Sequence, residues 1–379
     1  MNPKTKKRIL ITLLISLSII IIAVAGATIT VQQKLNLVEY DVEETISINP
    51  TQEFIEIVED EVDVLEEIDD VTGSDFKEVI KNWATNGGEK MKSEDVINIL
   101  LIGSDASLED PKRANKAENG NTDVMMVVSI NPKEKTVKLV SFMRDSYTYM
   151  EQFDRFAKLN AACANGGPLY LIETIENNYK IEIDGYVLVS FDSFIKVIDA
   201  LGGVKVDVPA YVANSLNSDI LKNNNMSSGE NVLLDGEQAL AFSRVRKTDA
   251  NGDVSRVARQ RQVINALIEK AKGASLSEIN EVLDIVLANI KTNISQKEIL
   301  VYAKSALTEG WANFEITELT MPTQDTRKSY NSKSTAWVWI IDYPLVAQKL
   351  QIELYGETNI KLNEERETAI TILNEYLSD

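Results

Sequence analysis

An uncharged apolar run near the N-terminus limits what the first part of this chain can become. The run extends over 23 residues, from Ile9 to Val31, and it follows a basic stretch with Lys4, Lys6, Lys7 and Arg8. A helix rises about 1.5 Å per residue, so a helix of this length spans the roughly 30 Å hydrocarbon core of a membrane. Basic flanks stay on the cytoplasmic side. We therefore predict a cytoplasmic tail (1–8), a transmembrane signal-anchor helix (9–31) and an extracellular remainder.

The same run has an alternative interpretation as a cleaved signal peptide. Ala23, Ala25 and Ala27 are small residues of the kind found before a cleavage site. The apolar run is, however, longer than the apolar region of a usual signal peptide. A retained anchor is therefore favoured, and it makes the protein a single-pass protein of the cell membrane.

A strongly acidic segment follows the predicted anchor. Between Asp41 and Asp70 there are thirteen Asp or Glu residues and no Lys or Arg. Such a like-charged segment is typical of an extended or loosely helical spacer. Apolar residues at helical spacing then predict a short helix over Ser74–Trp83. We assign residues 32–92 to this linker and expect the folded domain to begin near Ser93.

Two residue types that carry much enzyme chemistry are scarce in this sequence. The chain has no histidine and a single cysteine, Cys163. This excludes Ser-His-Asp and Cys-His nucleophiles, histidine-bound zinc, CxxC redox chemistry and internal disulfides. Lys and Arg total 39 against 58 Asp and Glu, a formal net charge of −19. A chain this acidic repels polyanions, so nucleic acid is not an expected partner.

Predicted strands alternate with predicted helices after residue 93. The strands are expected at 98–102, 123–130, 136–142, 186–189, 204–208, 314–320 and 337–341, and a loop at 215–229. The helices are expected at 168–179, 191–200, 235–242, 254–272, 276–290, 295–307, 343–354 and 363–377. This alternation favours an α/β protein, a single layered α-β-α extracytoplasmic domain with a central mixed sheet. We place this domain at 93–356 and a C-terminal helical tail at 357–379.

The segment Ala241–Gln262 is basic within an acidic protein. It carries six Lys or Arg residues against two Asp residues. Arg244 and Arg246 alternate across Val245, so a strand would point both guanidinium groups to one face. Arg256, Arg259 and Gln260 would share one side of a helix that starts at Asp253. Arginines beside a helix N-terminus predict a phosphate site, with a solvated basic face as the alternative.

Two aspartates lie where predicted strands meet polar loops. Asp105 follows the first strand of the domain and Asp123 begins the next one. Two hard carboxylates, together with phosphate oxygens and water, suit Mg²⁺, although each aspartate alone is more typical of a cap or a turn. The adjacent pair Arg144-Asp145 is interpreted as a surface ion pair. Residues 161–168 are interpreted as a loop that leads into a helix, in which Cys163 is packed rather than reactive.

Seven short motifs occur in an order that closely resembles the LytR-CpsA-Psr family. They are Asn98-Ile-Leu-Leu-Ile-Gly-Ser-Asp105, Thr122-Asp123-Val-Met-Met-Val-Val-Ser-Ile-Asn-Pro132, Ser141-Phe-Met-Arg-Asp145, Lys158-Leu-Asn-Ala161, Ala164-Asn-Gly-Gly-Pro168, Leu234-Asp-Gly-Glu-Gln-Ala239, and Arg244-Val-Arg246 with Gly252-Asp253, Arg256 and Arg259-Gln260. Seven ordered motifs are far more specific than any one of them. The resemblance covers roughly residues 96–272, and the anchor and linker are compatible with it.

The resemblance implies a function. Proteins of this family are membrane-anchored, extracytoplasmic enzymes of mainly Gram-positive envelopes. They transfer a glycopolymer, such as teichoic acid or capsular polysaccharide, from a polyprenyl-pyrophosphate carrier to peptidoglycan. The product is a phosphodiester to a muramic acid 6-hydroxyl. The resemblance thus implies an Mg²⁺-dependent phosphotransferase whose partners are the lipid-linked polymer, peptidoglycan and the membrane.

The resemblance also implies roles for individual residues. The metal ligands would be Asp105 and Asp123. The pyrophosphate would be surrounded by Arg144, Lys158, Arg244, Arg246, Arg256 and Gln260. The catalytic residues would be Arg144, Asp123, Asp253, Arg244 and Arg246. Asp253 would orient the arginines, and Asp123 or Asp253 would accept the proton of the acceptor hydroxyl. Phosphoryl transfer depends on positioning and on neutralising charge over phosphate oxygens, which arginines and Mg²⁺ provide.

The sequence departs from the family pattern at two positions. Many members have Arg two positions before the aspartate that corresponds to Asp123, whereas this chain has Asn121. Arg113 or Lys116 is a possible substitute in the preceding loop. Met143 stands where a proline is frequent, which changes local turn stiffness.

Two alternative functions use the same residues. One is a non-catalytic envelope regulator that binds polyprenyl pyrophosphate or anionic glycan. The other is a hydrolase that cleaves polyprenyl pyrophosphate with water as the acceptor. Both predict lipid binding, and neither predicts transfer to peptidoglycan.

Overall fold

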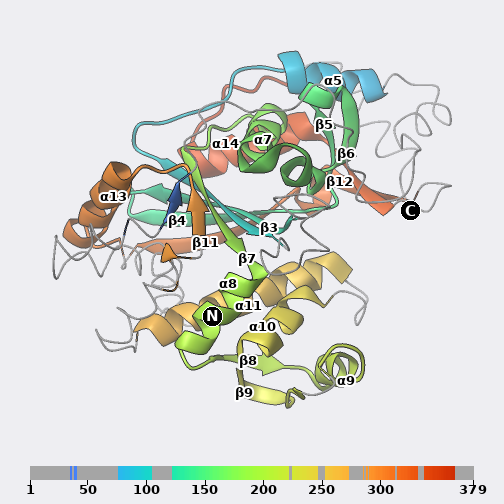
Figure 1. Ribbon diagram of the computed structural model, residues 1–379. Coiled ribbons are helices and arrows are strands. Elements are labelled where there is room, and N and C mark those ends of the chain that lie inside the picture. The colour runs from blue at the N-terminus through green and yellow to red at the C-terminus, as the bar shows by residue number, and fades with distance from the viewer. Residues whose placement is uncertain are drawn as a thin grey trace. The chain divides into compact units, whose positions relative to one another are not determined.

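The computed structural model describes eleven stretches of the chain: residue 35, 38–40, 76–104, 122–221, 224–245, 252–272, 285, 287–288, 290–311, 314–331 and 337–362 (Figure 1). The predicted anchor at 9–31, most of the acidic linker and the predicted helix at 363–377 lie outside these residues. Within the described stretches, no helix is both long enough and apolar enough to span a membrane. The anchor therefore stays a prediction.

Seven strands form the largest sheet of the described chain, in the order β1, β10, β7, β2, β3, β4, β11. Their bounds are Glu39–Tyr40 for β1, Ile97–Ser104 for β2, Thr122–Asn131 for β3, Thr136–Phe142 for β4, Gly185–Ser190 for β7, Ile290–Thr292 for β10 and Glu315–Met321 for β11. β1 pairs in parallel with β10, whereas β10–β7 and β2–β3 are antiparallel, so the sheet is mixed. The predicted α/β fold with a central mixed sheet is confirmed.

Strand β3 shows why the sheet could be predicted. Its residues from Met125 to Ile130 are all buried. Successive side chains of a strand point to opposite faces, so both faces of β3 are covered. A strand of this kind is a continuous apolar run in the sequence.

The chain divides into two compact units, and each is assembled from segments that are distant in sequence. The first unit comprises 1–42, 131–137 and 187–317, and the second comprises 43–130, 138–186 and 318–379. Because the segments interleave, neither unit is a continuous stretch of chain. The division does not test the predicted domain boundaries at 93 and 356.

The described residues of the second unit form three helices and two hairpins besides its strands of the large sheet. The helices are α5 (Phe76–Asn86), α7 (Ala161–Tyr179) and α14 (Tyr343–Tyr355); the hairpins are β5 (Tyr147–Met150) with β6 (Arg155–Lys158), and β12 (Arg327–Asn331) with β13 (Trp337–Ile341). Tyr179 lies at the centre of its core, with edge contacts to the rings of Phe142 and Tyr343. The predicted short helix before the domain is confirmed as α5.

The first unit packs helices on a small two-stranded sheet. Its helices are α8 (Phe191–Ala200), α9 (Ala210–Asp219), α10 (Gly236–Arg244), α11 (Gly252–Lys272) and α13 (Gln296–Thr308), and its small sheet is β8 (Val204–Val208) with β9 (Gly229–Leu234). Val204, Val206 and Val208 point inward from β8 and pack with Phe242 and Val263 in one core. The alternate residues of β8 are exposed, as the period of a strand requires.

Three secondary-structure predictions are wrong at some of their residues. Residues 161–166 form a helical segment instead of a loop, because three buried alanines, the residue type with the best helix propensity, occupy half of it; the predicted break is only at Gly167, whose φ of 75° kinks the helix before Pro168. The predicted loop 215–229 includes the last turn of α9, and its final residue begins β9. Within the predicted helix 276–290, the described residues 285 and 287 are helical, whereas Ile290 is the first residue of β10; most of its other residues lie outside the described stretches.

Candidate active site

Asp123 and Arg144 form the most direct ion pair among the predicted site residues. Asp123 is the second residue of β3, and Arg144 lies in the turn after β4. Arg144 Nη1 donates to Asp123 Oδ1 at 2.5 Å, and the Asp123 side chain is only 9% exposed. A charge-assisted hydrogen bond between two largely buried side chains fixes the conformation of both. The predicted arginine and the predicted metal ligand are therefore brought together.

The interpretation of Arg144-Asp145 as a surface ion pair is wrong. The Asp145 side chain is 2% exposed, and its two oxygens face different cations. Lys158 Nζ lies 3.2 Å from Oδ1, and Arg144 Nε lies 3.7 Å from Oδ2. Asp123, Arg144, Asp145 and Lys158 thus form one network, which we call the paired cluster. Buried charges of this kind require partners, because desolvation of an unpaired ion is costly.

Backbone hydrogen bonds hold the paired cluster in place. The Leu159 amide donates to the Ser146 carbonyl at 2.9 Å, and the Asn160 amide donates to the Arg144 carbonyl at 3.2 Å. Thr122 Oγ1 donates to the Asn160 carbonyl at 3.3 Å. The start of β3, the turn after β4 and the end of β6 are therefore joined. These bonds explain why the Lys158-Leu-Asn160 motif occurs as a unit.

Arg327 supports the same turn and was not predicted from the sequence. Its Nη1 donates to the Pro322 carbonyl at 2.8 Å and lies 3.1 Å from Met143 Sδ. Its guanidinium also stacks over the Trp339 ring, 4.5 Å from the ring centre. The Trp339 amide in turn donates to the Asp145 carbonyl at 2.9 Å. Met143, which replaces a frequent proline, thus gains rigidity from a cation that follows it by 184 residues.

The Leu234–Ala239 motif builds the start of helix α10 in the first unit. Asp235 caps the helix by accepting from the Gln238 amide, and Gln238 completes a capping box by accepting from the Asp235 amide. A Cβ on Gly236 would lie 2.5 Å from the Ile195 carbonyl oxygen, so only glycine allows α10 to approach α8 this closely. The motif therefore fixes the direction in which α10 delivers Arg244.

The predicted strand around Arg244 and Arg246 is wrong at Arg244. Arg244 is the last residue of helix α10, where a favourable interaction with the helix dipole holds a cation. Its guanidinium stacks over the Phe191 ring at 4.3 Å, and its side chain is exposed. Arg246 lies outside the described residues. The alternation argument failed because the Arg-Val-Arg spacing also fits a helix end.

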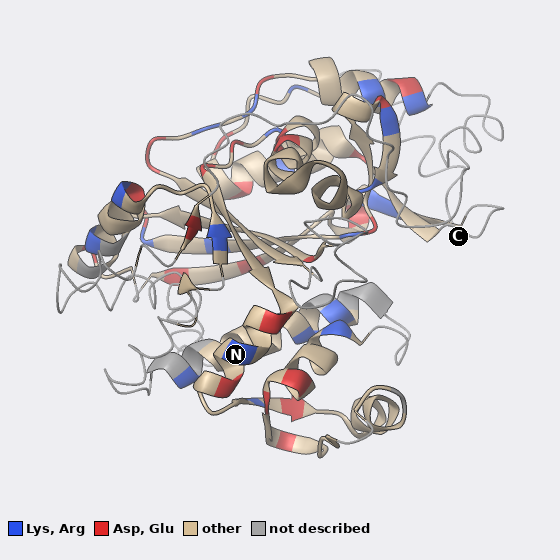
Figure 2. Cartoon of the chain, viewed as in Figure 1, with Lys and Arg blue, Asp and Glu red and all other residues tan. Residues whose placement is uncertain are grey.

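Helix α11 carries the predicted phosphate ligands Arg256 and Gln260, and basic residues recur along it (Figure 2). The helix begins at Gly252, close to the predicted start at Asp253. Arg256, Arg259 and Gln260 are all buried. Arg259 Nη2 donates to the Val245 carbonyl and so ties α11 to the end of α10. We call Arg244, Arg256 and Arg259 the helix arginines. The side chain of Asp253 lies outside the described part of the chain.

Comparison with known proteins gives a consistent result. The model of the LytR_cpsA_psr family matches residues 62–352 of this chain. The chain belongs to the LytR-CpsA-Psr family. The match is wider than the 96–272 covered by the sequence motifs, and it includes Arg327 and Trp339.

Relatives of this LytR-CpsA-Psr protein carry informative names. The polyisoprenyl-teichoic acid–peptidoglycan teichoic acid transferase TagU of Bacillus anthracis is 36% identical over 222 residues, which cover 58% of this chain and 68% of TagU. The transferase TagV of Bacillus subtilis, with the same descriptive name, is 37% identical over 231 residues, which cover 60% of this chain and 57% of TagV.

Solved structures of similar proteins share the fold. The Streptococcus agalactiae protein gbs0355 superposes with a TM-score of 0.59 at 26% identity, covering 71% of this chain and 90% of that protein. A structure described as TagT bound to LIIa-WTA superposes with a TM-score of 0.54 at 26% identity, covering 71% of this chain and 96% of TagT. The fold of this chain is therefore that of other proteins of the family.

The predicted metal ligands of this LytR-CpsA-Psr protein lie only partly within the described residues. Asp105 lies outside the described residues, but Ser104 before it pairs with Thr122, the residue before Asp123. No group of three or more His, Cys, Asp or Glu side chains that could hold a metal occurs within the described stretches. Mg²⁺ usually takes one or two carboxylates and completes its shell with water and phosphate. One carboxylate on β3 and one directly after β2 fit that donor set.

The predicted site residues that the structure describes can now be placed within their units. The second unit brings together Asp123, Arg144 and Lys158 and adds Asp145. The first unit carries Arg244, Arg256 and Gln260 on α10 and α11, tied by Arg259. Cys163 is fully buried, so its predicted packed position is confirmed.

Proposed function

We propose that this chain is a membrane-anchored extracytoplasmic phosphotransferase that moves a glycopolymer from a polyprenyl-pyrophosphate carrier to peptidoglycan. The observation that carries the proposal is the paired cluster, which places Arg144 and Lys158 beside Asp123 and Asp145 in a member of the LytR-CpsA-Psr family. The names of TagU and TagV, which describe teichoic acid transfer to peptidoglycan, support the reaction type.

The proposed reaction exchanges one phosphate ester for another. The 6-hydroxyl oxygen of a muramic acid residue attacks the phosphorus on the glycan side of the pyrophosphate. The bond from that phosphorus to the bridging oxygen breaks, and polyprenyl phosphate leaves with the electron pair. The hydroxyl proton passes to a carboxylate, for which Asp123 and Asp253 are the two candidates. The products are a glycan–peptidoglycan phosphodiester and polyprenyl phosphate.

The cations of the chain are proposed to stabilise the charge of this exchange. Negative charge spreads over the phosphate oxygens in the transition state, so fixed cations accelerate the reaction. The proposed pyrophosphate ligands are Arg144, Lys158, Arg244, Arg246, Arg256 and Gln260. The contacts of Arg144 and Lys158 with buried carboxylates hold both cations in one conformation before substrate arrives.

Mg²⁺ is the proposed cofactor, held by Asp105 and Asp123. When bound, it would neutralise charge on pyrophosphate oxygens. Arg144 already donates to Asp123, so this arginine orients the carboxylate that would face the metal. The predicted helix at 9–31 would keep the domain at the outer membrane surface, where the lipid carrier lies.

A reconstituted transfer assay tests the proposal. The full-length protein in detergent is mixed with a synthetic polyprenyl-pyrophosphate saccharide and purified peptidoglycan. Saccharide bound to peptidoglycan and polyprenyl phosphate are both quantified, with Mg²⁺ and with a chelator. We expect equal amounts of the two products, and loss of both in the chelator.

Other outcomes would contradict the proposal. Release of polyprenyl phosphate with water as the only acceptor would indicate the hydrolase. Tight lipid binding without turnover under any metal condition would indicate the non-catalytic regulator. An Arg144→Ala, Arg244→Ala double variant that transfers at the wild-type rate would refute the site assignment.

A further inference from the structure

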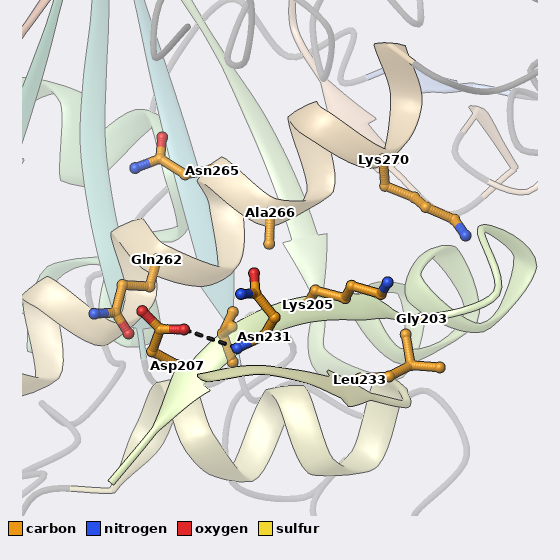
Figure 3. Close-up of a pocket in the computed structure, with 10 residues that line it drawn as sticks. Gly203, Lys205, Asp207, Asn231, Leu233, Gln262, Asn265, Ala266 and Lys270 are labelled. Carbon is orange, nitrogen blue, oxygen red and sulfur yellow. Dashed lines mark hydrogen bonds between the residues drawn. The ribbon is translucent and has the colours of Figure 1, made fainter. Parts of the chain in front are cut away.

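A pocket of about 590 Å³ lies in the first unit, between β8, β9 and helix α11 (Figure 3). Its volume falls in the range of about 300–1,000 Å³ that is usual for small-ligand sites. Six polar side chains line it: Lys205, Asp207, Asn231, Gln262, Asn265 and Lys270. None of these residues belongs to the proposed phosphotransfer site.

The backbone around the pocket is built to keep it open. A Cβ on Gly203 would lie 2.6 Å from the Leu234 carbonyl oxygen, and the φ of Gly203 is +84°, so glycine is required there. Lys270 Nζ approaches Gly202, where a Cβ would lie 3.7 Å from it. Asn231 has a φ of 52°, and its amide donates to Asp207 Oδ1 at 2.8 Å. This bond holds one wall of the pocket (Figure 3).

Five of the six polar lining side chains are free to bind a ligand; the sixth, Asp207, accepts from the Asn231 amide. Within the described stretches, the side chains of Asn231, Gln262 and Asn265 make no hydrogen bond, and Lys205 and Lys270 make no ion pair. Lysines elsewhere in this acidic chain do pair with carboxylates, as Lys90, Lys92 and Lys291 show. The pocket therefore collects donors and acceptors that the fold does not use.

The chemistry of the lining indicates the class of ligand. Carboxamides donate and accept at once, which suits the hydroxyl groups of sugars and polyols. Among the described lining residues, two ammonium groups against the single carboxylate of Asp207 favour an anion, and phosphate is an anion that lysine binds as a point charge. This described lining has no aromatic ring, so it offers no stacking platform for a nucleobase.

The pocket shares a helix with proposed pyrophosphate ligands. Gln262, Asn265 and Lys270 follow Arg256 and Gln260 on α11. At about 1.5 Å per residue, Arg256 and Lys270 are roughly 21 Å apart along the helix axis. A polymer that enters the pocket would therefore be held several units away from its reacting end.

We propose that this pocket binds a phosphate-bearing saccharide or polyol segment of the glycopolymer and so selects anionic chains. The inference rests on the proposed function, because it takes the polymer as the substrate. It adds a site that recognises the repeating part of the chain, separate from the pyrophosphate. Its consequence is a preference for long, anionic donors over short or uncharged ones.

The first test measures binding without any pyrophosphate. A lipid-free glycerol-phosphate oligomer is titrated into the full-length protein, with an uncharged maltooligosaccharide and inorganic phosphate as comparison probes. We expect Lys205→Gln with Lys270→Gln to weaken oligomer binding roughly tenfold or more, which corresponds to about 1.4 kcal/mol or more. Asn265→Ala should weaken it less, because it removes only a neutral contact.

A matched control removes the same charge elsewhere in the first unit. Lys297 and Lys304 are exposed on α13, outside the pocket. Lys297→Gln with Lys304→Gln should bind the oligomer as the wild type does. Equal weakening by the two double variants would overturn the proposal, as would equal affinity of the wild type for the oligomer and for inorganic phosphate.

The second test separates this proposal from the proposed function. Transfer is compared for a minimal lipid-pyrophosphate disaccharide and for a long polyol-phosphate donor. The pocket variant should retain transfer of the disaccharide and lose much of the preference for the long donor. A pocket variant that keeps the full preference for the long donor would refute the pocket proposal alone. Absence of transfer by the wild type with both donors would refute the proposed function, and the binding test would still decide the pocket.

Discussion

The paired cluster and the helix arginines hold positive charge in different ways. In the paired cluster, Arg144 Nη1 lies 2.5 Å from Asp123 and Lys158 Nζ lies 3.2 Å from Asp145. Among the helix arginines, Arg259 donates to the Val245 carbonyl and Arg244 stacks over Phe191. These two contacts, with a carbonyl and with a ring, orient the guanidinium groups and add no negative charge beside them.

The difference indicates a division of labour. Carboxylates balance the cations of the paired cluster, so this region contributes fixed geometry more than attraction. The helix arginines lie in a segment with six basic and two acidic residues, so that region contributes net positive charge within a chain of −19. Fixed geometry should govern turnover, whereas net charge should govern binding and its salt dependence.

The largest expected effect is on turnover in the paired cluster. Arg144→Ala removes a proposed hydrogen-bond donor to the phosphate and also leaves Asp123 without this ion pair, so we expect the rate of transfer to fall about 10²–10³-fold. Arg244→Ala removes one exposed contact and should cost about tenfold, mainly through weaker substrate binding. Steady-state kinetics of both variants measure the contrast. Equal losses in kcat would break the division of labour.

The paired cluster also shows what the sequence could predict and what it could not. The residues Asp123, Arg144 and Lys158 belong to ordered motifs, so the family resemblance placed them. The burial of Asp145 was missed because its partners are remote in sequence: Trp339 in β13 donates to its carbonyl, and Lys158 at the end of β6 pairs with its side chain. Arg327 was missed for the same reason. Local spacing carries no information about partners across a fold.

A similar limit applies to the fold. Strands β2, β3 and β4 were predicted because long apolar runs mark buried strands. Helix α9 was missed because Asn, Ser and Asp, which are typical of loops, occupy most of the second half of the helix. The hairpin of β5 and β6 was missed because its strands have only four residues each. Periodicity needs longer segments to be visible.

The second prediction concerns the stability of the paired cluster. Asp145→Asn keeps the shape of a buried side chain but leaves Lys158 and Arg144 without its charge. We expect the free energy of unfolding to fall by about 3–5 kcal/mol, measured by chemical denaturation. Asp325→Asn is the matched control, because its ion pair with Lys349 is exposed, and it should change stability far less. Adding Lys158→Met to Asp145→Asn should recover part of the loss.

The third prediction uses a lysine of the second unit that lies outside the paired cluster. The Lys180 side chain is buried, and its Nζ donates to the Ala84 carbonyl at 3.0 Å. Burial, with a smaller contribution from repulsion by Lys90, lowers the pKa of Lys180 from 10.5 to about 8. Between these two pH values the unfolded chain binds more protons than the folded chain. The free energy of unfolding should therefore rise with pH in this window.

The expected rise is about 1–3 kcal/mol between pH 7.5 and pH 9.5. Above pH 10 the opposite trend begins, because burial raises the pKa of Tyr149 to about 12 while unfolded tyrosines ionise near 10. Denaturation curves at several pH values measure the slope. Lys180→Met should flatten it, and an unchanged slope in that variant would show that another group is responsible.

The smallest expected effect tests how the helix arginines are positioned. Asp235→Ala removes the N-cap of α10 and should lower the free energy of unfolding by about 1 kcal/mol, whereas Asp235→Ser keeps a capping oxygen and should cost much less. Arg244 lies at the opposite end of the same helix, so a loosened cap should weaken substrate binding less than Arg244→Ala does. Binding and thermal unfolding of both variants give the answer. Charge that merely attracts substrate tolerates a small loss of helix order, whereas charge that must contact a transition state does not. If Asp235→Ala instead reduced kcat as strongly as Arg144→Ala, the helix arginines would therefore share the fixed-geometry role.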